Sequence, residues 1–204
     1  MNYGETLAYW YLRLNGFFPL VDFVLHKHEE TVTHSADCDI LAVRHPHTYE
    51  AVGGLSSDWD QKLTELSINP VEGTVGIIVE VKTGKNTSDS RENITKSFSR
   101  ARVEYAIQRL GFWPQQEARR IANELNTKSN YKEGGFQVVK LLIADDMPDS
   151  RHDSWGKLTL KDVDEFIYNR FSLYNQKFSD RHHFPSDLMQ YMIWKERTLR
   201  CQRG

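Results

Sequence analysis

The chain has little cysteine and no long apolar run. Among its 204 residues only Cys38 and Cys201 are cysteines. So few cysteines exclude a disulfide framework, and neither has a partner at a zinc-binding spacing. No segment is long and apolar enough to cross a membrane, and no secretory signal pattern is present. These absences predict a reduced, cytoplasmic protein that has no zinc and does not enter a membrane.

A strong charge of one sign is also absent. The chain has 26 Lys and Arg residues and 28 Asp and Glu residues, which give a formal net charge of -2. Because the chain as a whole does not attract polyanions, a nucleic-acid partner would have to be held by local basic patches. With 39% hydrophobic residues the chain can bury a sizeable core, which fits a globular enzyme or binding domain.

The spacing of apolar residues divides the chain into helices and strands. A helix is predicted over residues 5–15, followed by strands over 17–25 and 37–44 that form a hairpin. Residues 45–74 contain several Pro and Gly residues and are predicted to be an insertion with a short helix within 57–66. The other predicted elements are strands over 75–83, 136–144 and 157–160 and helices over 91–110, 114–125, 161–171 and 186–200.

The strand over 75–83 ends in an unusual way. It reads Ile77-Ile78-Val79-Glu80-Val81-Lys82-Thr83, so an apolar run is followed by two opposite charges two residues apart. Side chains alternate between the faces of a strand, so Glu80 and Lys82 share one face. Charges at the end of a buried strand are costly unless they are paired, solvated or bound to a metal. An ordinary ion pair and a metal-assisted hydrolytic site both satisfy this requirement.

Two more acids precede this pair, each on a predicted element. Asp39 lies on the second strand, in Ala36-Asp37-Cys38-Asp39-Ile40-Leu41-Ala42, and Glu5 lies on the first helix. This order resembles the PD-(D/E)XK nuclease superfamily, notably its restriction-endonuclease-like and Holliday-junction-resolvase-like branches. The resemblance implies an α/β fold with a restriction-endonuclease-like core, a mixed central β-sheet flanked by helices in the order αβββαβ. We expect a single domain over residues 1–204, with the core at about 4–145 and a helical C-terminal extension at about 146–204.

The resemblance also implies an activity, the Mg²⁺-dependent endonucleolytic hydrolysis of phosphodiester bonds in DNA. Asp39, Glu80 and the backbone carbonyl of Val81 would bind Mg²⁺, for which Mn²⁺ would substitute. Lys82 would orient or deprotonate the attacking water, and Glu5 would complete the catalytic set through a metal-bound water or a second metal. Asp37, on the same strand face as Asp39, is a weaker candidate ligand.

Basic residues that follow the Glu-x-Lys strand are candidate contacts to the phosphate backbone. They are Lys85, Lys96, Arg100 and Arg102. The alternative for those on the helix is a solvated face paired with Glu92 and Glu104. Glu5 likewise has an alternative role, as a first-turn acid favoured by the helix dipole.

The sequence is also compatible with other functions. The same fold could be a nucleic-acid or protein interaction module without catalysis. It could also be a nuclease that acts on RNA, as a homodimer, or only beside a partner subunit. Residues 45–74 and the C-terminal extension lie outside the shared core, so we expect specificity or partner binding to reside there.

Overall fold

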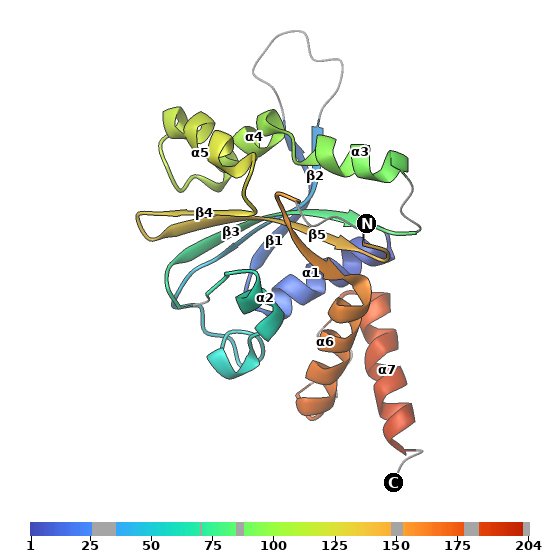
Figure 1. Cartoon of the computed structure of the whole chain (residues 1–204). Coiled ribbons are helices and arrows are strands. Elements are labelled where there is room, and N and C mark those ends of the chain that lie inside the picture. Colours follow the sequence, from blue (N-terminus) through green and yellow to red (C-terminus); the bar gives the residue numbers. More distant parts are fainter. Residues whose placement is uncertain (26–35, 70, 85–87, 148–152, 178–183, 202–204) are drawn as a thin grey trace.

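The computed structural model describes residues 1–25, 36–69, 71–84, 88–147, 153–177 and 184–201. Within these ranges a mixed six-stranded β-sheet lies between two layers of helices (Figure 1). The strands are β1 (Phe18–Leu25), β2 (Ala36–Arg44), β3 (Thr74–Lys82), β4 (Asn130–Glu133), β5 (Phe136–Ala144) and β6 (Gly156–Thr159). The helices are α1 (Tyr3–Leu14), α2 (Gln61–Glu65), α3 (Ser88–Ser97), α4 (Arg100–Leu110), α5 (Ala118–Leu125), α6 (Leu160–Leu173) and α7 (Asp187–Cys201), with short 3-10 turns η1 (Ser56–Asp58) and η2 (Gln115–Glu117).

The sheet combines an antiparallel meander with parallel strands. β1, β2 and β3 pair antiparallel in sequence order, and β5 then lies parallel to β3. The far edge of β5 is shared, because β4 pairs with its first half and β6 with its second half. The prediction of an α/β fold with a mixed sheet flanked by helices is therefore confirmed.

Each face of the sheet buries its own apolar core, as the alternation of side chains along a strand requires. Ile77, Val79 and Val81 of β3 pack on the face covered by α1, α6 and α7. Ile78, between two of them, packs with α4 and α5 on the opposite face. Glu80 and Lys82 continue the second set, so their strand position directs them toward the face of α3 and α4 (Figure 1).

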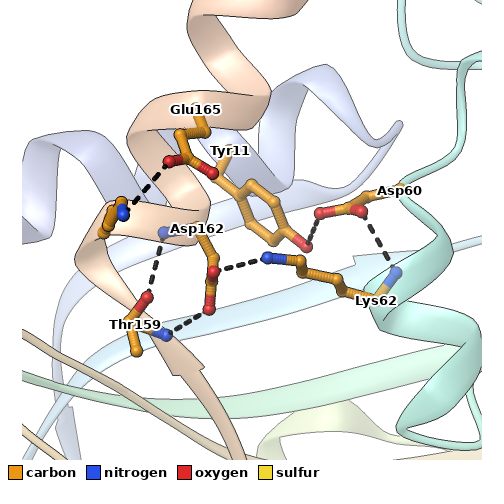
Figure 2. Close-up of polar contacts among 7 residues, drawn as sticks. Tyr11, Asp60, Lys62, Thr159, Asp162 and Glu165 are labelled. Carbon is orange, nitrogen blue, oxygen red and sulfur yellow. Dashed lines mark hydrogen bonds and ion pairs between the residues drawn. The ribbon is translucent and has the colours of Figure 1, made fainter.

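The segment 45–74 is fastened to α1 and α6 by polar contacts. The hydroxyl of Tyr11 donates to Asp60 Oδ2 at 2.7 Å, and Lys62 forms an ion pair with Asp162 (Figure 2). Asp162 also closes a capping box with Thr159 at the start of α6. We call Tyr11, Asp60, Lys62 and Asp162 the brace cluster. It joins the insertion to the C-terminal extension, the two parts expected to carry specificity.

The prediction of one helix over residues 91–110 is wrong. The chain forms α3 and α4 with a break at Phe98 and Ser99, where Ser99 has extended backbone angles (φ -58°, ψ 149°). Phe98 is buried and stacks on Trp155, with ring centroids 5.5 Å apart. In the second half, α4 buries Val103 and leaves Ala101 exposed. The first helix therefore ends next to a residue that packs against a distant part of the chain.

The strand β4 has no counterpart among the predicted elements. It forms a hairpin with β5 through Gly134 and Gly135, whose φ angles are 62° and 81°. A two-residue turn with positive φ at both positions is the favoured hairpin connection, and glycine adopts it without strain. The Gly-Gly pair was the sequence signal for this strand.

Candidate functional site

An open hollow lies where the ends of β2 and β3 meet α3 and α4. Its volume is about 340 Å³, and it is lined by Asp39, Glu80, Lys82, Asn93, Lys96, Ser97 and Arg102. The antiparallel register, in which Ile40 faces Val79, brings the two carboxylate-bearing positions of neighbouring strands side by side. The three residues predicted from the Asp and Glu-x-Lys pattern are thus gathered in one place.

Asp39 is held by the backbone of the neighbouring strand. Its Oδ2 accepts a hydrogen bond from the amide of Val81 at 2.7 Å. Burial, followed by the nearby charge of Glu80, raises the pKa of Asp39 to about 6, although the Val81 amide and the charge of Lys82 each lower it. The charge of Glu80 thus opposes ionisation of Asp39, and a cation bound between the two carboxylates would relieve this repulsion.

Glu80 is fixed from two directions. Its Oε1 accepts hydrogen bonds from Lys82 Nζ at 2.5 Å and from Ser97 Oγ at 2.7 Å. Its side chain is only 8% exposed, whereas that of Lys82 is 33% exposed and reaches the solvent. One carboxylate oxygen is thus occupied, and Oε2 accepts no hydrogen bond from the described residues.

Cys38 lies close to the same two carboxylates. Its thiol is buried beside the hollow, and burial together with the charges of Glu80 and Asp39 raises its pKa to about 12. The thiol therefore stays protonated and unreactive at physiological pH. Cys38 is a packing residue next to the site.

Ser97 and Asn93 are site residues that the sequence analysis missed. Both come from α3, four residues apart, and both line the hollow. Residues at this spacing share one face of a helix, so two small polar residues after the Glu-x-Lys strand were the available signal. The break after Ser97 made them hard to place, because the sequence predicted an uninterrupted helix.

Glu5 lies near the hollow but is bonded to its own helix. Its carboxylate accepts from the backbone amide of Asn2 at 2.9 Å and from Asn2 Nδ2 at 2.6 Å, closing a capping box. Its negative charge contributes to raising the pKa of Asp39, although Glu5 is not among the residues that line the hollow. The capping role is observed, and the catalytic role stays a prediction.

The structure separates the candidate phosphate contacts. Lys96 and Arg102 line the hollow, whereas Arg100 is outside its lining and pairs with Glu104 at 3.2 Å. Lys96 also pairs with Glu92 at 2.7 Å, as the solvated-face alternative predicted. Arg102 forms no ion pair with the part of the chain that the structure describes, which leaves its guanidinium available to a phosphate.

Two other candidates cannot be placed. Lys85 lies outside the described residues. The side chain of Asp37 is not described either, although its backbone pairs with Val24 of β1.

The hollow offers oxygen donors of the kind that Mg²⁺ prefers. Within the described ranges no group of three or more His, Cys, Asp or Glu side chains is arranged to hold a metal. The donors in its lining are two carboxylates, of Asp39 and Glu80, and the backbone carbonyl of Val81, between Glu80 and Lys82 in the sequence, stays a predicted ligand. Mg²⁺ is usually bound through one or two carboxylates while water and substrate phosphates fill the other positions, so this small set fits it.

No helix in the described part of the chain is long and apolar enough to cross a membrane.

Comparisons with protein-family models, with curated proteins and with solved structures found no match to this chain. Its function therefore has to be inferred from the hollow and the residues that line it.

Proposed function

We propose that the chain is a Mg²⁺-dependent endonuclease of the PD-(D/E)XK type that hydrolyses phosphodiester bonds in DNA. The observation that carries this proposal is the gathering of Asp39, Glu80 and Lys82, from two strands, in one open hollow. The order α1, β1, β2, β3, α4 and β5 supports a restriction-endonuclease-like core. The raised pKa of Asp39 supports a cation between the carboxylates.

The carboxylates of Asp39 and Glu80 and the carbonyl of Val81 would hold the metal. When bound, Mg²⁺ supplies charge neutralisation at the phosphate and favours ionisation of water. The amide of Val81 orients Asp39, and Ser97 orients Glu80, so each carboxylate is held before substrate arrives. Such preorganisation lowers the cost of reaching the transition state.

Lys82 would act on the attacking water and on the phosphate. As an ammonium in an ion pair with Glu80 it has no lone pair to accept a proton, so it orients the water rather than deprotonating it. The water oxygen would bond to phosphorus while the bond to the departing sugar oxygen breaks, and negative charge would grow on the phosphate oxygens. The ammonium favours this charge because it is fixed beside them. The proton of the attacking water would pass to bulk water, and the departing sugar oxygen would take a proton from bulk water.

Arg102 and Lys96, on the α3–α4 side of the hollow, would hold the DNA backbone. A guanidinium without a carboxylate partner can bind two phosphate oxygens at once. Lys96 can contribute only after it leaves Glu92 or shares it, so Arg102 is the stronger contact.

The second candidate function is binding without cleavage. It is favoured by the absence of a third acidic ligand among the described side chains, because Glu5 is bonded to Asn2. Asp39, Glu80 and Lys82 would then serve only to place charge on the binding surface.

One experiment distinguishes the two functions. Purified protein is incubated with supercoiled, linear, single-stranded and branched DNA and with RNA, in Mg²⁺, Mn²⁺ or EDTA. We expect metal-dependent cleavage of DNA that is lost in Glu80→Ala and Lys82→Ala and kept in Glu124→Gln, a change to an exposed carboxylate on α5. Cleavage that persists in both site variants overturns the assignment, and metal-independent binding without cleavage favours the second function.

A further inference from the structure

Asp145 follows β5 directly and contacts the end of β3 in two places. Its backbone amide donates to the carbonyl of Lys82 at 3.1 Å, and its Oδ2 accepts from the amide of Gly84 at 3.1 Å. Asp145 therefore forms hydrogen bonds with both residues that flank Thr83. The turn that leaves the Glu-x-Lys strand is fixed at this point, where Gly84 has a φ of 96°.

The same carboxylate oxygen also binds α1. The hydroxyl of Tyr3, the first residue of α1, donates to Asp145 Oδ2 at 2.7 Å. Tyr3 precedes Glu5 by two residues, so Asp145 connects the helix turn that carries Glu5 to the strand end that carries Lys82.

The first turn of α1 rests directly on the end of β3 at the neighbouring residue. A Cβ added to Gly4 would lie 2.5 Å from Thr83 Cγ2 and 3.2 Å from Val81 Cγ1. The backbone of α1 approaches this closely only because residue 4 has no side chain. The contact sets the separation of the two elements, and the bonds of Asp145 fix their relative position.

We infer that Asp145 is a positioning residue of the proposed nuclease site, holding Lys82 and the carbonyl of Val81 in register with the first turn of α1. This inference rests on the proposed function. Asp145 touches neither metal nor substrate in this role, since it acts through the backbone of Lys82 and Gly84 and through Tyr3.

The bonds of Asp145 are of the strong, charge-assisted kind. The hydroxyl of Tyr3, followed by the amide of Gly84, lowers the pKa of Asp145, so its carboxylate is ionised at neutral pH. Asp145 is exposed and Tyr3 is 52% exposed, so removing either side chain empties no part of the core. An effect on catalysis can therefore be separated from an effect on folding.

The test compares Asp145→Ala with two matched variants. Asp145→Asn keeps an oxygen that can accept both side-chain hydrogen bonds, and Asp146→Ala removes a neighbouring exposed carboxylate that has no bond to the described residues. We expect Asp145→Ala to lower kcat about 10-fold with little change in KM for DNA, because small displacements of a catalytic group are costly. The kcat of Asp145→Asn and that of Asp146→Ala should each stay within about twofold of the wild-type value.

A second readout does not depend on cleavage. Mn²⁺ is titrated into the metal-free protein by calorimetry, and we expect Asp145→Ala to bind it several-fold more weakly than Asp146→Ala. Tyr3→Phe should change both readouts in the same direction, with no further effect when combined with Asp145→Ala, because the two side chains share one bond.

The outcomes separate this inference from the proposed function. If wild type cleaves DNA and Asp145→Ala matches it in kcat and in Mn²⁺ affinity, the positioning role is overturned and the nuclease stands. If wild type cleaves nothing but Asp145→Ala weakens Mn²⁺ binding, the proposed function fails and the positioning role is kept. A lowered melting temperature with unchanged kcat and Mn²⁺ affinity means a purely structural residue and overturns the inference.

Discussion

Two polar clusters lie on opposite faces of the sheet, and the pKa of a carboxylate is shifted in opposite directions in the two clusters. In the brace cluster, burial opposes ionisation of Asp162, but hydrogen bonds from Lys62 and Thr159 outweigh it and its pKa is lowered. In the hollow, burial and the charge of Glu80 raise the pKa of Asp39 to about 6. The first cluster satisfies its charges and fastens the insertion to α6 (Figure 2). In the second cluster one carboxylate opposes the ionisation of its neighbour, which is an arrangement that a bound cation would stabilise.

The largest expected effect comes from an experiment that replaces one carboxylate by an amide on each face of the sheet. We expect Glu80→Gln to reduce DNA cleavage by about 10³-fold, because a proposed metal ligand and the partner of Lys82 are lost together. Asp60→Asn, in the brace cluster, should keep cleavage within about threefold on the same scale. Initial rates on supercoiled DNA in Mg²⁺ measure both. Equal losses in the two variants would show that the clusters do not have separate roles.

The two clusters should also change stability with pH in opposite directions. The pKa of Asp39 is raised from its ordinary 3.8, so its stabilising contribution is complete below pH 3.8 and is lost as pH rises through about 6. Relative to Asp39→Asn, metal-free wild type should lose about 1–2 kcal/mol over this range, after allowance for partial solvent screening. The pKa of Asp162 is lowered, so its contribution is present above its unfolded pKa and is lost as pH falls through the folded one.

Urea unfolding of wild type, Asp39→Asn and Asp162→Asn between pH 3 and pH 8, in EDTA, measures these contributions. The prediction is contradicted if the wild-type minus variant difference has the same slope with pH for both substitutions.

A third experiment compares two arginines of α4, one inside the hollow and one outside it. Arg102→Ala should raise the KM for DNA about 10-fold. The slope of log binding constant against log salt concentration should become shallower by about 1, because one phosphate contact is lost. Arg100→Ala is the matched control, because Arg100 lies two residues earlier on α4 and pairs with Glu104. Binding is measured in Ca²⁺ or EDTA over a range of salt concentrations. Equal effects of the two substitutions would mean that α4 contributes only general positive charge.

The smallest expected effect is on the brace cluster alone. Lys62→Met should lower the free energy of unfolding by about 1 kcal/mol, because a partly exposed ion pair with Asp162 is lost. Cleavage at 25 °C should not change. Urea unfolding at pH 7.5 gives the stability and the plasmid assay gives the activity. A large loss of activity would place the brace cluster in the catalytic machinery.

Local sequence patterns predicted much of this fold for a physical reason. The meander strands and α1 are long and strongly periodic, so burial of one face selects their structure. Asp39, Glu80 and Lys82 were found because each sits on such an element, in an order that resembles a known superfamily. Their grouping in one hollow follows from the register of β2 and β3.

Other residues could not be found in this way. Ser97 reaches Glu80 from the end of α3, and α3 ends there at the break where Phe98 packs on Trp155. Arg100 and Arg102 read alike in the sequence, and only the packing of α4 puts one of them in the hollow. Asp145 is an unremarkable acid after a strand until its bonds to Tyr3 and Gly84 are seen.

Short-range periodicity in the sequence predicted most of the helices and strands and placed the acids and the lysine at strand ends, although it did not predict β4. The resemblance of their order to a known superfamily predicted the mixed α/β fold. Tertiary structure alone decided which side chains share the hollow, where the α3–α4 break falls and how the insertion is tied to α6. Each of these depends on contacts between residues far apart in the chain. Such contacts are selected by the packing of the whole molecule and leave no local pattern.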